Sequence, residues 1–495
     1  MGISLKATFL ANTLSQVFVT ALAILLVPVY LRWLGAEAYG LVGLFATLQA
    51  WFNLLDMGLT PTLARESSRF HAGAMSAQAF RQLFRGMGLV FGGLAVLGAI
   101  LLWSLAPWAE AHWLQRQSLL ADEVLWALRA MAMAVVLRWV AGLYRGFLTG
   151  TDRQVGLAAV TVVMACVRYL GVLAAMAYWG ATVQVFFDFQ LFAALLETLV
   201  LVIWTHAVLP AAPNPLAWSL RSVRPVLGMG LSLAFASSVW VLVNQADKLL
   251  LSGLLPLADY GLFSLAVVLA SGVMVLSGAL SQALMPRLAV LHAKGQSVEM
   301  MALYRRSTRW MSAMGLGGAL TLAVLAEPVL LAWTGQHAIA GKMSGVLALY
   351  ALGYGFACLA AFPYYLQYAL GQMRLHVWGN ALMLLVLVPS VWLVAPIWGG
   401  LGTAIVWLIL NFCFGAFWGG VVHRRYWPGQ HLRWLWRDIT LSSAPALLGA
   451  IALWLWLPLP QSRWGALAWA VFAGGTLLGL NVLVLRWRER TEELA

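Results

Sequence analysis

The chain has 495 residues, of which 62% are hydrophobic and only 9% are charged, and its formal net charge is +13. Soluble domains carry about 25% charged residues, so this composition excludes an ordinary water-soluble protein. We therefore expect an all-α polytopic membrane protein. The three cysteines, Cys166, Cys358 and Cys413, lie in apolar runs without metal-ligand or disulfide spacing, and we expect them to be small core residues.

Fourteen apolar segments follow one another along the chain, each long enough to cross a hydrocarbon core ~30 Å thick. The first is too long for a cleaved signal peptide and has no small-residue cleavage site. We expect transmembrane helices at about residues 8–31, 40–63, 84–106, 124–147, 154–178, 184–208, 225–248, 260–283, 309–331, 344–369, 376–395, 401–422, 438–458 and 464–485.

Basic residues gather on one side of this arrangement. With the N-terminus placed in the cytoplasm, 22 Lys and Arg residues fall on the cytoplasmic side and five on the opposite side. Because cytoplasmic loops carry an excess of Lys and Arg, we expect both termini to be cytoplasmic. Arginine and tryptophan alternate in residues 424–438 and 486–490, a pattern typical of a membrane interface with anionic headgroups. The basic charge therefore gives no reason to expect nucleic acid as a partner.

The sequence repeats itself at a spacing of 221 residues. The phrase "AEAYGLV" at residues 36–42 has its counterpart "LADYGLF" at residues 257–263. Three further identities fall at the same spacing: Tyr144 with Tyr365, Gly150 with Gly371, and Arg153 with Arg374. This shift lays the first six segments on the next six, and because six is even, both halves keep the same orientation.

The repeat predicts three parts of the chain. Residues 1–210 form an N-terminal six-helix bundle, and residues 211–424 form a second bundle that repeats it. Residues 425–495 add two transmembrane helices and a cytoplasmic tail. Two parallel bundles with a seam between them favour alternating access, with the substrate held in a central cleft.

Two stretches carry a resemblance to a known family. "ANTLSQVFVTALAILLVPVYLRWLGAEAYGLVGLFATL…LLDMGLTPTLARE" is similar to the start of the Wzx-type polysaccharide flippases, O-antigen and exopolysaccharide exporters of the multidrug/oligosaccharidyl-lipid/polysaccharide superfamily. "NQADKLLLSGLLPLADYGLFSLAVVLASGVMVLSGALSQALMPRL" resembles the start of that family's second half. The resemblance implies transfer of an undecaprenyl-pyrophosphate-linked glycan from the cytoplasmic to the periplasmic leaflet of a bacterial inner membrane. Membrane lipids and a polymerase or ligase of the same pathway are the other expected partners.

Charges inside the membrane are the candidate substrate-binding residues, because each costs at least ~2.5–3.5 kcal/mol at mid-depth. The candidates are Arg129, Arg138, Arg168, Asp188 and Glu197. By depth, we expect Arg129 to face Asp188, and Glu197 to face Arg138 or Arg168. Three cations against two anions leave positive charge for a pyrophosphate, and the alternative is that these are ion pairs that only position helices.

Helix geometry separates these arginines. Arg129 and Arg138 are nine residues apart, so at ~100° per residue they point to opposite faces of their helix. Arg145 lies seven residues beyond Arg138, shares its face and extends it toward the cytoplasm.

A second set of polar residues predicts a gate or a site for a coupling ion. It comprises Asp56, Arg65, Asn244 and Asp247. We expect Arg65 to pair with Asp56, and we expect Asp247 and Lys248 not to face each other because they are sequence neighbours on a helix. Coupling to a proton or sodium ion is open, and a plain structural role for these residues is the alternative.

The sequence contains no catalytic residues that we can assign, no metal site and no cofactor motif. Two alternatives lie within the same superfamily, a lipid II flippase and a cation-coupled drug exporter. A drug exporter would more naturally have an acidic cavity and twelve spans. A remote alternative is a membrane glycan polymerase or ligase, but the longest outer loop, about residues 107–123, is too short to fold alone.

Overall fold

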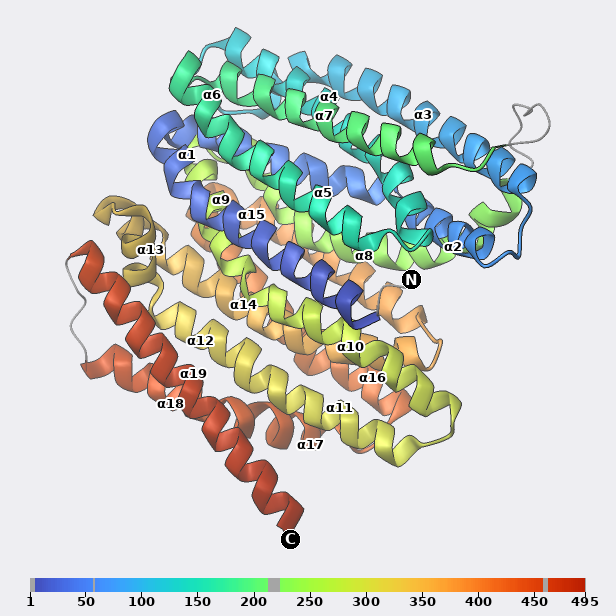
Figure 1. The fold of residues 1–495 in the computed structure, drawn as a ribbon. Coiled ribbons are helices and arrows are strands. Elements are labelled where there is room, and N and C mark those ends of the chain that lie inside the picture. The colour runs from blue at the N-terminus through green and yellow to red at the C-terminus, as the bar shows by residue number, and fades with distance from the viewer. Residues whose placement is uncertain (1–4, 57, 212–222, 457–461, 495) are drawn as a thin grey trace. The chain divides into compact units, whose positions relative to one another are not determined.

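The computed structural model describes residues 5–56, 58–211, 223–456 and 462–494. In these residues the regular secondary structure is helical, apart from one isolated bridge between Gln115 and Pro256 (Figure 1). Ten helical runs are long and apolar enough to cross a membrane, or eleven if the bent pair Ser297–Val324 and Ala326–Thr334 forms one span. The all-α, multi-pass fold is thus confirmed. The count of fourteen spans and the cytoplasmic location of both termini stay predictions.

Two glycines account for part of the difference between the number of helical runs and the number of predicted spans. The first helix bends at Gly35 (φ 84°, ψ 168°), and the longest helix of the second half bends at Gly399 (φ 58°, ψ −140°). Positive φ is readily adopted by glycine alone, so the chain can turn there while helix continues on both sides. Both bends lie within single apolar runs: Leu10–Phe52 covers parts of the predicted spans 8–31 and 40–63, and Arg374–Tyr426 contains the spans 376–395 and 401–422.

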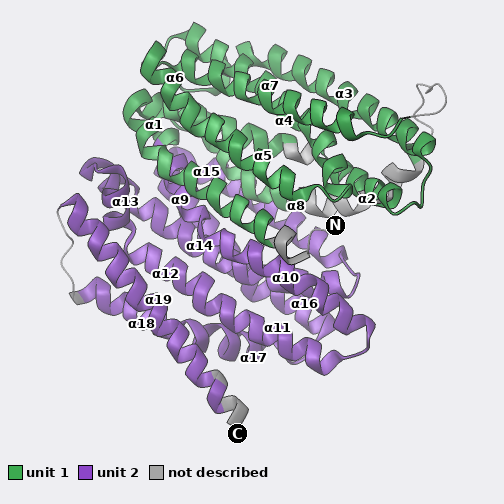
Figure 2. Ribbon diagram, viewed as in Figure 1, with its two compact units in different colours: residues 1–261 green, residues 262–495 purple. Residues whose placement is uncertain are grey.

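The chain divides into two compact units, residues 1–261 and 262–495 (Figure 2). The predicted boundary at residue 210 rests on the repeat in the sequence, and it stays a prediction.

In the first unit α4 is the central helix. It packs against α2, α3 and α7, while α1 packs against α5 and α8. Hydroxyl side chains begin two of these helices: Ser76 accepts from the Ala79 N–H group at the start of α3, and Thr182 accepts from the Val185 N–H group at the start of α7. The helices are α1 (Leu5–Leu55), α2 (Leu59–His71), α3 (Ala77–Trp108), π-helical turn η1 (Ala109–Trp113), α4 (Ala121–Gly150), α5 (Gln154–Cys166), π-helical turn η2 (Val167–Gly171), α6 (Val172–Trp179), α7 (Val183–Val208) and α8 (Arg224–Leu254).

In the second unit α14 is central and packs against α10, α12, α13 and α15, while α19 packs against α12, α13 and α18. Helix α9 (Leu257–Ser271) begins in the first unit and continues into the second. The other elements are α10 (Val273–Ala293), α11 (Ser297–Met311), η3 (Ser312–Leu316), α12 (Gly317–Val324), α13 (Ala326–Thr334), α14 (His337–Ala369), α15 (Arg374–Cys413), η4 (Phe414–Trp418), α16 (Gly419–Tyr426), α17 (His431–Arg433), η5 (Trp434–Thr440), α18 (Leu441–Trp456) and α19 (Arg463–Leu494).

One repeated glycine has different roles in the two halves. Gly371 has φ 67°, so it supplies the left-handed residue of the turn before α15. Its counterpart Gly150 is the last residue of α4, and a methyl group added there would overlap the carbonyl oxygen of Ala64. The left-handed residue of that turn is Asp152 (φ 58°). The same residue is therefore needed for backbone freedom in one half and for close helix packing in the other.

Candidate functional site

Arg138 lies near the middle of α4, and its guanidinium is held between α1 and α7. Its Nη1 donates to Oε1 of Gln49 on α1 (2.6 Å), and its Nη2 donates to Oε1 of Gln190 on α7 (3.0 Å). The centre of the guanidinium also lies 5.0 Å from the centroid of the Phe45 ring. Both acceptors are neutral amides, so these hydrogen bonds fix the guanidinium without neutralising its charge.

The guanidinium of Arg138 still has donors to offer. It has five N–H groups. One N–H group of Nη1 donates to Gln49, and one N–H group of Nη2 donates to Gln190. Its Nε–H group is buried and has no acceptor among the described residues. A ligand that brings several acceptor oxygens, such as a phosphate, would satisfy these donors with charge-assisted hydrogen bonds.

Arg168 lies in the π-helical turn η2, where the normal helical hydrogen bonding is interrupted. Its Nη2 donates to the hydroxyl of Tyr169 (3.0 Å), and its guanidinium lies 4.4 Å from the Tyr169 ring centroid. Side chains from other helices serve the carbonyl groups of this turn. The hydroxyl of Tyr30 donates to the carbonyl of Tyr169 (2.7 Å), and Nε2 of Gln190 approaches that of Arg168 at 3.5 Å. Single π-helical turns of this kind are frequent at functional sites.

Gln190 joins the two arginines. Its amide oxygen accepts from Arg138, while its amide nitrogen faces the backbone carbonyl of Arg168. The side chain of Gln190 is buried. Since one glutamine contacts both residues, the structure brings Arg138 and Arg168 into one cluster, together with Gln49 and Tyr169. We call these five residues the arginine cluster.

A carboxylate follows one step along the same pair of helices. Arg145 lies seven residues after Arg138 on α4, and Glu197 lies seven residues after Gln190 on α7. Arg145 forms an ion pair with Glu197. The shared face of Arg138 and Arg145 is thus confirmed, whereas the expectation that Glu197 faces Arg138 or Arg168 was wrong. In the described residues, neither Arg138 nor Arg168 forms an ion pair with a carboxylate.

The expected pair of Arg129 and Asp188 was also wrong. The Arg129 guanidinium lies 4.9 Å from the Trp103 ring centroid, in a cation–π arrangement. The carboxylate of Asp188 accepts from Nε1 of Trp126 (2.7 Å). Both tryptophans are exposed on the surface of the first unit, with 42% and 43% of their area accessible. Arg129 and Asp188 therefore contact aromatic side chains rather than the arginine cluster, and their predicted role in substrate binding stays untested.

Asp56 has a local task at a break in the second predicted span. Its carboxylate accepts from the hydroxyl of Thr60 (2.6 Å) and from the Thr60 N–H group (3.1 Å), at the start of α2. Gly58 precedes α2 with φ 72°, which lets the chain turn at this point. Asp56 thus satisfies donors that a helix start leaves free. The gate role predicted for Asp56 and Arg65 stays a prediction.

The second candidate ion site contains a contact that sequence spacing did not predict. Asp247 is fully buried, and Nζ of Lys248 lies 3.2 Å from its carboxylate, so the expectation that these neighbours do not face each other was wrong. The flexible lysine stem allows its ammonium to fold back, and it also donates to the carbonyl of Asn244 (2.5 Å). Lys248 thus already supplies the positive charge that a coupling cation would bring. The predicted coupling role of Asn244 and Asp247 is untested.

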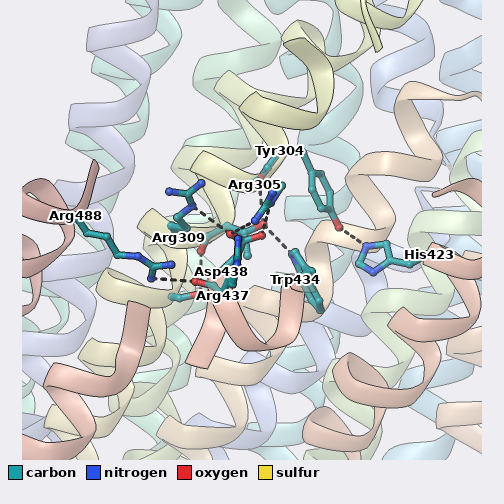
Figure 3. A network of polar contacts seen from close by, with 10 residues as sticks. Tyr304, Arg305, Arg309, His423, Trp434, Arg437, Asp438 and Arg488 are labelled. Atoms are coloured by element: carbon teal, nitrogen blue, oxygen red, sulfur yellow. Dashed lines mark hydrogen bonds and ion pairs between the residues drawn. The ribbon is translucent and has the colours of Figure 1, made fainter. Parts of the chain in front are cut away.

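The second unit has its own polar network (Figure 3). Arg305 on α11 donates through Nε to one oxygen of Asp438 (2.7 Å) and through Nη2 to the other (3.2 Å). Arg309, one turn further on, donates to the same carboxylate (3.1 Å). The Asp438 side chain has no solvent exposure. A single buried anion therefore ties α11 to the turn η5 that precedes α18.

Further hydrogen bonds extend this network. The Tyr304 hydroxyl lies 2.8 Å from Nε2 of His423, and Nε1 of Trp434 donates to the Thr308 hydroxyl (3.0 Å). In α19, Arg488 donates to the carbonyl of Arg437 (3.0 Å). These contacts join α16 and η5 to α11, and α19 to η5. The network is thus a structural joint for the last predicted spans.

The described residues contain no group of three or more His, Cys, Asp or Glu side chains placed to hold a metal ion. What sequence reasoning missed was Gln49, Gln190 and Tyr169. Glutamines and tyrosines are uncharged and give no signal inside an apolar segment, although the arginines that they contact do.

Comparison with known proteins assigns the chain to a family. The model of a family described as "Polysaccharide biosynthesis protein" matches residues 5–292. No curated protein sequence matches the chain significantly.

Three similar solved structures show the fold. The lipid II flippase MurJ in an inward closed conformation has a TM-score of 0.74 at 11% identity, covering 99% of both chains. An inward-facing MATE family multidrug resistance transporter of the MOP superfamily has a TM-score of 0.67 at 12% identity, covering 86% of this chain and 96% of that one. A MOP superfamily transporter from Pyrococcus furiosus has a TM-score of 0.60 at 14% identity, covering 85% and 95%.

Proposed function

Because the chain belongs to the polysaccharide biosynthesis protein family, whose model matches residues 5–292, we propose that it is a flippase for a lipid-linked glycan. The substrate would be an undecaprenyl-pyrophosphate-linked oligosaccharide, moved from the cytoplasmic to the periplasmic leaflet of a bacterial inner membrane. Movement by alternating access, in step with a polymerase or ligase of the same pathway, completes the proposal. The similar solved structures are those of a flippase and of transporters, which supports a transport role rather than catalysis.

The observation that carries the proposal is the state of Arg138. It is held by two glutamines that leave its charge uncompensated, and it shares Gln190 with Arg168. An uncompensated cation inside a membrane is costly, so a positioned pair of them calls for an anionic ligand. The pyrophosphate of a lipid-linked glycan is a ligand of that kind, and the planar donor fork of arginine suits it.

Substitution of the two arginines tests this role. In cells that lack the gene, we expect Arg138→Ala or Arg168→Ala to lower glycan export per folded molecule at least about tenfold, the effect of losing a hydrogen bond between charged groups. Arg138→Lys should recover part of the export, because lysine keeps the charge and loses the fork. Arg69→Ala is the matched control, since Arg69 is half exposed and pairs with Glu66 on α2.

A purely structural role would give another result. The amount of Arg138→Ala protein in the membrane would then fall together with export, and export per molecule would stay normal. The combination of normal abundance with normal export would likewise refute substrate contact.

A lipid II flippase is the second candidate, and the likeness of fold over 99% of both chains favours it. Expression in cells depleted of their own lipid II flippase separates the two. Rescue of growth would support lipid II, and rescue of surface polysaccharide alone would support the glycan. The drug-transporter fold covers only 86% of this chain, and the uncompensated charge in the first unit is basic, so a cation-coupled drug exporter is the weaker alternative.

A further inference from the structure

One loop of the first unit contacts both copies of the repeated phrase. It consists of residues 113–119, from the last residue of η1 to just before α4, and we call it the strap. One end of the strap meets Glu37, within the first copy of the phrase, and the other meets the end of α8 and the residues that lead into the second copy. All of these residues belong to the first unit. The predicted topology places them on the side opposite the cytoplasm.

Glu37 binds the strap through its backbone. Its carboxylate accepts from the N–H groups of Gln117 (2.5 Å), Ser118 (2.8 Å) and Leu119 (3.4 Å), and from the Ser118 hydroxyl. The Glu37 side chain is buried, and among the described residues no basic side chain pairs with it. Four converging donors are thus what compensates this carboxylate, and charge-assisted hydrogen bonds of this kind are the stronger ones. If the strap moved away, Glu37 would lose all of them at once.

The other end of the strap binds the second repeat. Nε1 of Trp113 donates to the hydroxyl of Ser252 (3.0 Å), and the Trp113 ring covers Gly253 so closely that a side chain there would overlap it. Nε2 of Gln115 donates to the carbonyl of Gly253 (3.0 Å). The backbone carbonyl of Gln115 accepts from the Leu257 N–H group (2.9 Å). Ser252 is fully buried.

Beneath the strap the two copies of the phrase touch through their glycines. A methyl group on Gly40 would overlap the carbonyl oxygen of Leu257, and one on Gly261 would overlap the carbonyl oxygen of Ala36. Leu257 and Gly261 stand 221 residues after Ala36 and Gly40, so each copy makes the same contact with the other. This mutual packing explains why both copies carry glycine at this position, since any side chain would push the backbones apart.

We propose that the strap is a releasable latch that holds the outer ends of the two repeats together and detaches when this side of the protein opens. The strap residues from Gln115 to Ser118 are exposed, and its contacts with both repeats are hydrogen bonds that water can replace. The contact beneath is close packing of the two backbones, with the Leu257 side chain against Gly40 and one hydrogen bond between the hydroxyls of Thr47 and Tyr260 (3.2 Å). The proposal rests on the alternating access of the proposed function, and its first test needs no knowledge of the substrate.

The first test measures release of the strap. In a variant with Cys166, Cys358 and Cys413 replaced by alanine, Ser252→Cys places a thiol beneath Trp113. We expect a membrane-impermeant maleimide to modify this thiol slowly, and roughly tenfold faster when Glu37→Gln removes the charge that holds the strap. Glu110→Gln is the matched control, because Glu110 pairs with Arg116 of the strap itself and, in the described part of the chain, makes no hydrogen bond or ion pair with either repeat phrase. Equal rates with and without Glu37→Gln would overturn the latch.

The second test locks the strap. Gln115→Cys with Pro256→Cys joins two residues that form a backbone bridge, a geometry close enough for a disulfide. Oxidation should stop glycan export and reduction should restore it. The control pair Glu110→Cys with Arg116→Cys links the strap to η1 rather than to either repeat phrase and should leave export unchanged. Undiminished export by the oxidised 115–256 pair would refute release. Faster thiol modification by Glu37→Gln in a protein that exports no glycan would sustain the latch and reject the proposed substrate.

Discussion

The two units treat their inner arginines in opposite ways. In the first, Arg138 is held by neutral glutamines and keeps its charge, whereas in the second, Arg305 and Arg309 share the buried carboxylate of Asp438. An amide orients a guanidinium, while a buried carboxylate also neutralises it. The acceptor, rather than the arginine, therefore separates a site prepared for an anionic ligand from a joint between helices.

Substitution of Asp438 is expected to have the largest effect on the contrast between the two units. Asp438→Asn leaves two partly buried arginines without their anion, and loss of one partner of a buried ion pair costs about 3–5 kcal/mol. We expect the amount of protein in the membrane and its thermal stability in detergent to fall sharply, with normal export per remaining molecule. A variant that is as abundant as the parent would show that the network is no joint.

The ion pair on α4 and α7 is the intermediate case. Arg145→Ala leaves Glu197 buried and alone, and we expect a loss of about 1–3 kcal/mol in the free energy of unfolding. Adding Glu197→Gln should recover most of it, as a double-mutant cycle would measure. Additive losses in the cycle would mean that the pair contributes nothing as a pair.

Gln190 tests the role of the neutral amide acceptor in the first unit. Gln190→Leu removes an acceptor of Arg138 and the amide group that faces Arg168, so we expect roughly tenfold weaker export, the effect of losing a hydrogen bond to a charged group. Protein abundance should change little, because leucine fills a similar volume. Gln190→Glu tests the principle directly: a carboxylate at this position should neutralise Arg138 and inhibit export further. Faster export by the glutamate variant would contradict the proposed role of uncompensated charge.

The smallest effect is expected in the second unit. Trp434→Phe removes the hydrogen bond to Thr308 and keeps the ring that packs beside it, so the free energy of unfolding should fall by about 1 kcal/mol. Thermal unfolding in detergent would measure this, with export unchanged. A loss of export in this variant would place the network in the transport cycle.

The sequence predicted how far along each helix a charged residue lies, but it did not predict how each helix is rotated about its axis. Apolar segments, arginine distribution and the 221-residue spacing predicted an all-α membrane protein and placed Arg138 and Arg168 near mid-helix. Which side chain an arginine meets depends on how each helix is turned about its axis, and this is set by packing across helices far apart in sequence. Depth alone paired Arg129 with Asp188, yet each of them contacts a tryptophan instead. Within a single helix, where rotation follows from the seven-residue spacing, the shared face of Arg138 and Arg145 was predicted correctly.

Some features had no signal at all. The bend at Gly35 joins two predicted spans into one helical run, and apolar composition does not register it. In the sequence, Asp438 stands beside Arg437 at the start of the predicted span 438–458, where a solvated carboxylate is ordinary. Its complete burial arises from α11, more than a hundred residues earlier in the chain.

The mutual contact of Gly40 with Leu257 and of Gly261 with Ala36 has the form of an isologous interface, in which residue i of one copy meets residue j of the other and the reverse. Interfaces of that form ordinarily join two separate, identical subunits in a symmetric dimer. Here the same surface is used by two stretches of one polypeptide. The two copies thus meet, inside a single chain, by a contact of the form that joins the subunits of a symmetric dimer.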